Sequence, residues 1–205
     1  MTRIIAGTAR GRRLAVPASG TRPTSDRVRE AVFSIIESRW LAEGTSWPHV
    51  TVLDLFAGTG AFGLEALSRG AAAAVLVEKS RVAARALSAN VGAVGCAGAQ
   101  VLVRDARQIA ALPPVDGGVS LCFVDPPYDW SASAIALLLT ELGAAGWLAP
   151  ASLVIVERPT KDAASPLPAG IEGPRQRAYG DTSLWYGHHT EAGRSGPGSP
   201  DGRHQ

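Results

Sequence analysis

TVLDLFAGTGAFG, residues 51–63, decides the fold, because an apolar run passes directly into a glycine-rich turn. The run predicts a strand, and Gly58, Gly60 and Gly63 let the backbone turn tightly and approach a ligand as the next helix begins. The free N–H groups at the start of that helix favour a nucleotide. Taken alone, the motif also fits a dinucleotide-binding oxidoreductase.

Apolar runs and alanine-rich segments alternate after this motif. The runs are continuous, which indicates strands buried on both faces and hence a parallel sheet covered by helices. We expect further strands at 73–78, 99–106, 119–125 and 152–158, and helices at 80–93, 106–112 and 131–146. Residues 175–187 predict two strands around a Gly180-Asp181 turn, with an antiparallel strand at the sheet edge. The sequence therefore predicts an α/β fold with a Rossmann-like sheet.

The N-terminal segment has a different pattern. Residues 3–17 predict two short strands around a turn, and Pro17 ends the second strand. A helix follows Pro23, where Thr24, Ser25 or Asp26 can cap its start. We expect three parts: a basic β-hairpin at 1–20, the main domain at 21–187, and a disordered tail at 188–205 whose composition cannot form a core.

Arginines are concentrated at the N-terminus. The first 30 residues contain seven arginines against Asp26 and Glu30, although the formal net charge of the whole chain is only +2. Arginine is suited to bidentate contacts with phosphate. The segment is therefore a candidate nucleic-acid contact, with an ordinary solvated surface as the alternative.

The bulk composition favours a soluble cytoplasmic protein. Hydrophobic residues make up 46% of the 205 residues, yet no apolar run approaches the roughly 20 residues that span a bilayer. The N-terminus lacks the apolar core of a signal peptide. Cys96 and Cys122 fall in an expected loop and a buried strand, which suggests neither a disulfide framework nor a metal cluster.

Carboxylates stand at the ends of successive predicted strands. Asp54 precedes the glycines, where a carboxylate suits a cationic, amino-acid-bearing ligand better than a pyrophosphate; capping of the next helix is the alternative. Glu78 can accept both hydroxyls of a ribose. Asp105, with Ala106 beside it, can meet an adenine amino group or simply cap a helix. Asp54 favours S-adenosylmethionine (AdoMet) over NAD, whereas the feature at Glu78 is shared by NAD and AdoMet sites and indicates only a nucleoside.

Asp125-Pro126-Pro127-Tyr128 begins at the last residue of the strand expected at 119–125. An aromatic amino group is a poor nucleophile because its lone pair is delocalised, so it needs acceptors that aim it at the methyl donor. The Asp125 carboxylate and the Pro126 carbonyl can accept its two N–H bonds, and the prolines hold that carbonyl in place. Tyr128 offers a face for stacking an extruded base. The motif predicts amino methylation, with a plain Pro-Pro turn as the alternative.

Other chemistries are disfavoured. Methylation of cytosine C5 needs a cysteine thiolate, commonly in a Pro-Cys pair, and neither cysteine has that setting. Four histidines fall in expected loops or in the tail, namely His49, His188, His189 and His204, so no metal site is predicted.

Six segments, in this order, resemble the RsmD family of bacterial 16S ribosomal RNA guanine-N2 methyltransferases, which are class I AdoMet-dependent enzymes. They are RIIAGTARGRRLAVP (3–17), RPTSDRVREAVFSII (22–36), LDLFAGTGAFGLEALSRGA (53–71), VEKS (77–80), DPPY (125–128) and YGDTSLW (179–185). The resemblance covers roughly residues 2–187. It implies a seven-stranded, mostly parallel sheet with an antiparallel edge strand, AdoMet as methyl donor, and a guanine of 16S rRNA in the assembling 30S subunit as substrate.

The resemblance also implies the site residues. Catalysis is expected from residues 125–128. Cofactor contacts are expected from Thr24, Asp54, Phe56, Ala57, Gly58, Thr59, Gly60, Gly63, Glu78, Lys79, Asp105 and Ala106. RNA contacts are expected from Arg10, Arg12, Arg13, Arg22, Arg27 and Arg29. Many relatives carry Phe where this chain has Tyr128, a change that preserves the stacking face.

Two other functions stay open at this point. The Asp-Pro-Pro-Tyr chemistry is indifferent to which amino group enters, so adenine-N6 or other amino methylation of DNA or RNA is the enzymatic alternative. A non-catalytic RNA-binding module of ribosome assembly is the other, and the intact glycine and Asp-Pro-Pro-Tyr motifs argue against it. We expect a monomer, because the enzyme is small and its substrate is a large particle.

Overall fold

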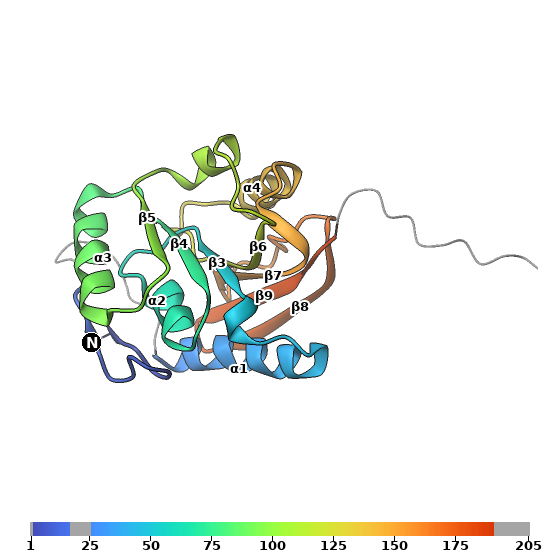
Figure 1. Ribbon diagram of the computed structural model, residues 1–205. Helices are drawn as coiled ribbons and strands as arrows, with labels where there is room; N and C mark the ends of the chain where they lie inside the picture. The colour runs from blue at the N-terminus through green and yellow to red at the C-terminus, as the bar shows by residue number, and fades with distance from the viewer. Residues whose placement is uncertain (1, 17–25, 191–205) are drawn as a thin grey trace, which may run out of the picture.

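The structure of the protein is a computed structural model that describes residues 2–16 and 26–190 (Figure 1). Its strands are β1 (Thr2–Arg3), β2 (Arg13–Leu14), β3 (Thr51–Asp54), β4 (Ala73–Val77), β5 (Ala99–Leu102), β6 (Val119–Val124), β7 (Leu148–Pro159), β8 (Ile171–Tyr179) and β9 (Thr182–His189). Its helices are α1 (Asp26–Glu43), α2 (Ala61–Ser68), α3 (Arg81–Val94) and α4 (Ala132–Ala144), with 3₁₀ turns η1 (Trp47–His49) and η2 (Ala106–Ala111). No helix in these two ranges is long and apolar enough to cross a membrane.

Seven strands form one sheet in the order β5-β4-β3-β6-β7-β9-β8. β3 pairs in parallel with β4 on one side and with β6 on the other. The chain winds outward from β3 to β5 in one direction and from β6 onward in the other, so the carboxyl ends of β3 and β6 flank a topological switch point. Ligands of open α/β sheets bind in the crevice at such a point. The predicted Rossmann-like α/β fold is confirmed.

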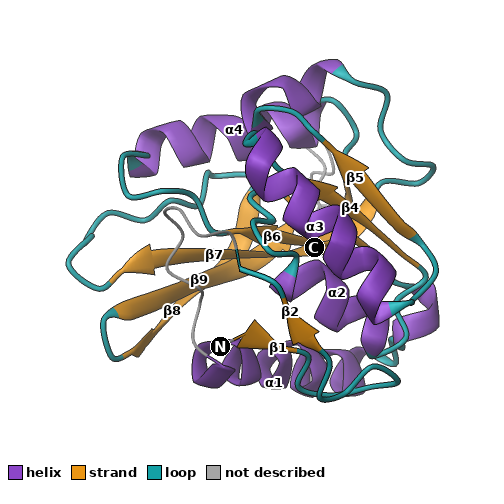
Figure 2. Cartoon of the chain, turned by 90° about the vertical axis from the view of Figure 1, so that its left-hand side faces the viewer, coloured by secondary structure: helices purple, strands orange, loops and turns teal. Residues whose placement is uncertain are grey.

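Helices cover both faces of this sheet. Successive side chains of β3 point to opposite faces, as the pleat of a strand requires. Val52 belongs to the core formed with the hairpin, α1, α2 and α3, whereas Leu53 belongs to the core formed with η2 and α4. Figure 2 shows α1 and the hairpin on one side of the sheet and α4 on the other. The continuous apolar runs of the sequence are explained by this burial on both faces.

The predicted N-terminal hairpin, β1 and β2, packs on α2 as part of the main fold. The Glu65 carboxylate, which is fully buried, accepts the N–H groups of Ile5 at 2.6 Å and Ala6 at 2.9 Å. The Ser68 hydroxyl donates to the Ala6 carbonyl at 2.6 Å. Gly7 has to be glycine here, because a Cβ atom would lie 1.8 Å from the Ser68 carbonyl oxygen. The hairpin is therefore held by the same helix that follows the glycine-rich turn.

The C-terminal strands confirm the predicted antiparallel pair at the sheet edge but differ from expectation in length. β9 pairs antiparallel with both β7 and β8, and β8 forms the edge of the sheet. β9 continues past Gly187, because His188 pairs with Leu153 of β7 and His189 pairs with Ile171 of β8. These two histidines therefore belong to the sheet, and the expectation of a tail beginning at residue 188 is wrong. Residues 191–205 lie outside the described residues.

Replacing Glu65 tests how firmly the hairpin is held. Glu65→Ala leaves two backbone N–H groups without their acceptor and removes the partner of Arg69 Nε, which lies 2.9 Å from the carboxylate. We expect the free energy of unfolding to fall by about 3 kcal/mol. The matched control is Glu37→Ala, because Glu37 also pairs with Arg69 but its side chain is 47% exposed. We expect this control to lose less than about 1 kcal/mol in urea titrations; equal losses would contradict the role of Glu65.

Candidate functional site

Asp54 lies at the carboxyl end of β3, beside the end of β6. Its side chain is 2% exposed, and its Oδ2 accepts the N–H of Gly63 at 3.1 Å. A Cβ atom on Gly63 would lie 2.1 Å from Leu76 Cδ2, so glycine is what brings α2 this close to the sheet. The N–H bond agrees with the helix-capping alternative for Asp54, and it fixes the direction of the carboxylate as well.

The Asp54 carboxyl group is strongly perturbed. Burial, which is the largest cause, and the negative charges of Asp125 and Glu78 together raise its pKa from 3.8 to about 7, against the hydrogen bonds from Gly63 and Phe56. The edge of the sheet therefore gathers three carboxylates, of which Asp54 is the buried one. Such a cluster favours a cation, because a positive charge offsets both the burial and the repulsion.

Glu78 follows β4 directly and holds the glycine-rich turn. Its Oε2 accepts the N–H of Gly58 at 3.0 Å, and its Oε1 accepts the N–H of Ser80 at 2.6 Å. A carboxylate offers about four lone-pair sites, so each oxygen keeps capacity for one further donor. Lys79, between Glu78 and Ser80, is exposed.

The glycine-rich turn has the predicted backbone conformation. Gly58 and Gly60 adopt left-handed φ angles of +53° and +82°, which glycine tolerates best. The Ala57 N–H donates to the Val77 carbonyl at 2.9 Å, which joins the turn to β4. Thr59 is 7% exposed.

Asn90 of α3 connects the turn to the hairpin, which the sequence did not indicate. Its Nδ2 donates to the Thr59 carbonyl at 2.9 Å and to the Ala15 carbonyl at 3.0 Å, and its Oδ1 accepts the Ala15 N–H at 2.7 Å. The side chain is 2% exposed. A single buried amide therefore fixes the glycine-rich turn relative to the end of β2.

Asp105 caps η2, as the alternative interpretation of the sequence supposed. Its Oδ1 accepts the Arg107 N–H at 2.9 Å, and its Oδ2 lies 3.4 Å from Arg107 Nη1. The Arg107 guanidinium lies 4.0 Å from the centre of the Trp130 ring, and Trp130 meets Phe56 edge to face with ring centres 5.1 Å apart. Ala106 is buried beside them. These aromatic and cationic contacts join the end of β5 to the loop after β6.

The segment Asp125–Tyr128 leaves β6 and turns outward. Asp125 is half-buried and Pro126 is buried, whereas Tyr128 is 72% exposed. The Pro127 carbonyl accepts the Trp130 N–H at 3.1 Å, which closes a turn immediately after the motif. The Asp125 charge acts on Asp54 at the switch point, while the Tyr128 side chain is exposed to solvent.

Arg158 anchors this loop from β7. Its side chain is 4% exposed; Nη2 donates to the Trp130 carbonyl at 2.7 Å and to Asp162 at 2.6 Å. A hollow of about 410 Å³ opens beside Tyr128 and is lined by residues 128–132, Arg158 and residues 162–164. In the sequence, the signal for this anchor is the cation Arg158, which follows Glu157 at the end of an apolar run.

The predicted RNA-contacting arginines have different surroundings. Arg10, Arg12, Arg13 and Arg27 are exposed, and Arg22 lies outside the described residues together with Thr24. Arg29 is fully buried: its Nη2 donates to the Arg3 carbonyl and to Asp26, both at 2.7 Å. A direct RNA contact by Arg29 is therefore wrong, because this side chain ties α1 to β1.

Cys122 lies buried within β6, close to Asp54. Burial and the Asp54 charge raise the pKa of its thiol far above the neutral range. A thiol of that kind is not a nucleophile at neutral pH. Within residues 2–16 and 26–190, no group of three or more His, Cys, Asp and Glu side chains is arranged to hold a metal ion.

Comparisons with known proteins give a consistent result. A family model described as "Conserved hypothetical protein 95" matches residues 2–188. The chain is 37% identical over 182 residues to ribosomal RNA small subunit methyltransferase D of Escherichia coli strain K12, covering 88% of this chain and 86% of that protein. It is 36% identical over 143 residues to the putative rRNA methyltransferase YlbH of Bacillus subtilis, covering 68% and 74% respectively.

Solved structures are similar as well. The putative methyltransferase yhhF from Escherichia coli superposes with a TM-score of 0.76 at 33% identity, covering 92% of this chain and 98% of that one. An RNA methyltransferase from Salinibacter ruber, in complex with S-adenosyl-L-homocysteine, gives a TM-score of 0.61 at 15% identity, with 88% and 100% covered. The second likeness concerns the fold alone.

The raised pKa of Asp54 makes stability depend on pH. The folded-state pKa of about 7 exceeds the ordinary 3.8, so protonated Asp54 contributes to the free energy of unfolding. This contribution is complete below about pH 4 and is lost as the pH rises through 7. Asp54→Asn keeps an oxygen for the Gly63 N–H but carries no charge. We expect the ligand-free variant to melt several degrees above wild type at pH 8, with an upper bound of about 4 kcal/mol, and the gap to shrink toward pH 4. A melting-temperature difference that is constant from pH 4 to 8 would contradict this assignment.

Proposed function

The chain belongs to the family described as conserved hypothetical protein 95, the RsmD family, and we propose that it transfers a methyl group from AdoMet to N2 of a guanine in 16S rRNA. The observation that carries the proposal is the position of Asp54 and Asp125 at the ends of adjacent strands. A cofactor held by Asp54 would there meet an amino group held by Asp125. Relatives named as small-subunit rRNA methyltransferases support the substrate class.

AdoMet suits the carboxylates on the β3 side of the site. Asp54, buried and raised in pKa, would bind the positively charged methionine end. Glu78 has oxygen capacity left for the two ribose hydroxyls. Asp105 and Ala106 would meet the adenine, although the capping bond to Arg107 occupies part of the Asp105 carboxylate. Phe56, Ala57, Thr59, Lys79 and Thr24 complete the proposed set. AdoMet supplies an electrophilic methyl group on a sulfonium.

The loop after β6 would position the accepting nitrogen. The Asp125 carboxylate and the Pro126 carbonyl accept its two N–H bonds, which localises the lone pair and directs it at the methyl carbon. Asp125 would take the proton that the nitrogen releases on methylation, and the donor would leave as a neutral thioether. Pro127 cannot compete because it has no N–H and its carbonyl is used by Trp130. Tyr128 stacks on the extruded base.

The choice of guanine N2 as the methylated atom is argued from the resemblance to the RsmD family. Adenine N6 is the competing target, because residues 125–128 hold any exocyclic amino group equally well. A monomer that acts on the assembling 30S subunit in the cytoplasm is proposed on the same basis. A non-catalytic RNA-binding module is disfavoured, since the Asp54 cluster would destabilise a protein that binds no cation there.

The deciding experiment identifies the methylated nucleoside. Purified protein is incubated with labelled AdoMet and either a naked 16S rRNA transcript or small subunits from an unmodified strain, and the RNA is digested for mass spectrometry. We expect N2-methylguanosine. N6-methyladenosine would overturn the guanine assignment, and the absence of AdoMet binding by calorimetry would favour the non-catalytic module.

Replacing Asp125 tests the mechanism. We expect Asp125→Ala to reduce the rate of methyl transfer at least a thousandfold, because the amino group loses its acceptor, while AdoMet affinity changes less than threefold. Asp129→Ala is the matched control, since Asp129 is an exposed aspartate in the same loop. We expect the control to keep near wild-type turnover. Turnover retained by Asp125→Ala would defeat the proposed role.

The hairpin arginines are tested without removing the hairpin, because Ile4, Ala9 and Leu14 belong to the core. We expect the triple replacement of Arg10, Arg12 and Arg13 by alanine to weaken binding to a 16S rRNA transcript about tenfold or more, and to flatten its salt dependence, since each lost phosphate contact lowers the slope by about one. The melting temperature and AdoMet affinity should stay at wild-type values. Unchanged RNA affinity would show that these exposed arginines are only a solvated surface.

A further inference from the structure

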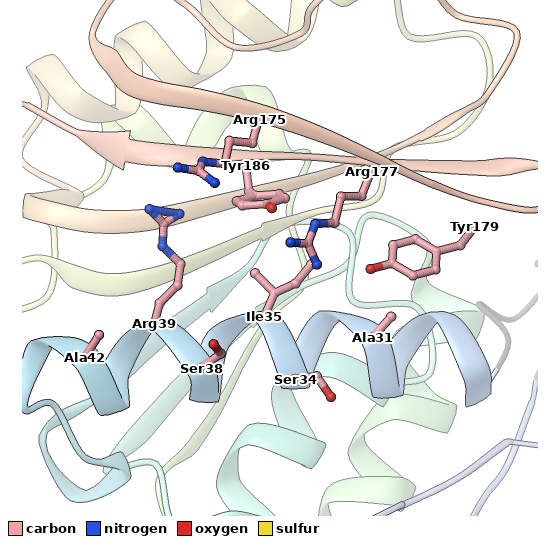
Figure 3. A pocket seen from close by; sticks show the side chains of 10 residues that line it. All are labelled: Ala31, Ser34, Ile35, Ser38, Arg39, Ala42, Arg175, Arg177, Tyr179 and Tyr186. Atoms are coloured by element: carbon pink, nitrogen blue, oxygen red, sulfur yellow. The ribbon is translucent and has the colours of Figure 1, made fainter.

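A groove of about 440 Å³ lies between α1 and the edge strand β8, apart from the loop after β6. Figure 3 shows its two sides. Small side chains of α1 form one side together with Arg39, which extends toward the sheet. Arg175, Arg177 and Tyr179 of β8 and Tyr186 of β9 form the other side and point back toward the helix.

The charge of this groove is one-sided. Its lining contains three arginines and, among the residues that the structure describes there, no carboxylate. Arg39 Nη1 is buried without a hydrogen-bond partner, and the guanidinium lies 5.7 Å from the centre of the Tyr186 ring. A hydrogen bond with the Tyr179 side chain raises the pKa of Arg177. Arg39 is half-buried, whereas Arg175 and Arg177 are exposed on β8. Guanidinium groups gathered in a groove without acids favour an anionic ligand.

The arginines of β8 are also arranged on one face. Arg175, Arg177 and Tyr179 alternate along the strand, so their side chains share the face toward α1, whereas Gln176 and Ala178 take the other face. Charged residues on an edge strand often prevent the strand from pairing with other chains. That role alone would not require both arginines to lie on the same face of β8. The arrangement therefore indicates a binding surface.

The register places this surface close to the catalytic edge. Val124 of β6 pairs with Val156 of β7, which pairs with Trp185 of β9, which in turn pairs with Gln176 of β8. Val124 and Gln176 therefore lie at the same level of the sheet. Asp125 and Arg177 are the next residues in the same direction, because β8 and β6 are both parallel to β7. Three strand spacings separate them, or roughly 14 Å. A polymer with one nucleotide at Asp125 can therefore reach the groove with its neighbouring nucleotides.

The same helix connects the groove to the hairpin. The first turn of α1 is tied to β1 by Arg29 and by the ion pair between Asp26 and Arg3, whose Oδ2–Nε distance is 3.4 Å. The following turns of α1 line the groove. α1 therefore connects the hairpin, which carries exposed arginines, to the groove.

We propose that the groove between α1 and β8 binds the sugar-phosphate backbone of the RNA next to the target nucleotide, through Arg39, Arg175 and Arg177. This inference rests on the proposed rRNA substrate and adds a second contact surface to the hairpin. The arginines bind phosphate and give affinity without reading sequence, which suits a site that must accept flanking nucleotides of any kind. The docked strand would run from the residue 125–128 loop across the sheet edge.

Charge reversal at one groove position tests the inference. Arg177→Glu is compared with Arg85→Glu, because Arg85 is an exposed arginine on α3, outside the groove. We expect Arg177→Glu to weaken binding to a 16S rRNA transcript at least tenfold at 0.15 M salt and to raise the KM for RNA with kcat retained at saturation. Arg177→Ala should lower the slope of log affinity against log salt by about one.

The control separates the possible outcomes. We expect Arg85→Glu to change RNA affinity less than twofold, and both variants to keep wild-type melting temperature and AdoMet affinity. Equal losses in the two variants would mean a general charge effect, and unchanged RNA affinity of Arg177→Glu would assign the groove to another partner, such as an acidic protein; either result overturns the inference. Wild-type turnover on 16S rRNA reports on the proposed function separately, because the affinity contrast needs no methyl transfer.

Discussion

The convergence of Asp54, Glu78 and Asp125 at the carboxyl edge of one sheet is the constraint on which the rest of the structure depends. Parallel strands bring their ends to the same edge, and the change of winding direction between β3 and β6 leaves room there for a ligand. The glycine-rich turn supplies N–H groups to Asp54 through Gly63 and to Glu78 through Gly58. The turn therefore serves the acids of the site as well as any ligand.

The two sides of the site have separate supports. On the β3 side, α2 and α3 hold the turn, with Asn90 as the buried link. On the β6 side, Arg158 of β7 holds the loop through the Trp130 carbonyl, and Arg107 covers the Trp130 ring. A bound cofactor and an entering base would meet between two separately supported parts of the site. Binding of one ligand is therefore not needed to form the binding site of the other.

The parts of the fold and site that follow from local pattern were predictable. Continuous apolar runs identified the parallel strands, and the acidic residues that end them identified Asp54, Glu78 and Asp125 as neighbours. The glycines were predictable because their conformations are required by the turn itself. Pairing of the C-terminal strands was only half predictable: the Gly180-Asp181 turn joins them, but nothing local specifies that β9 lies inside and β8 outside.

The parts that depend on distant partners were not predictable. Arg27 and Arg29 lie in the same predicted helix, and the sequence does not distinguish them. Arg29 is buried because it packs against β1, where it donates to the Arg3 carbonyl. Glu65 and Asn90 resemble ordinary polar residues of helices, yet their partners lie 60 and 75 residues away. The sequence allows Asp105 either to cap a helix or to contact the cofactor. Its hydrogen bond with the Arg107 N–H is compatible with both roles.

The docking of the hairpin on α2 also affects the order in which the chain can fold during synthesis. Ile4, Ala9 and Leu14 leave the ribosome first, but the acceptor of the hairpin, Glu65, is made 60 residues after Ile5. α2 has only eight residues and needs the sheet to be stable. The N-terminal apolar residues therefore stay exposed until β3, α2 and β4 have emerged, a non-local contact of the kind that slows folding and leaves nascent chains open to chaperone binding.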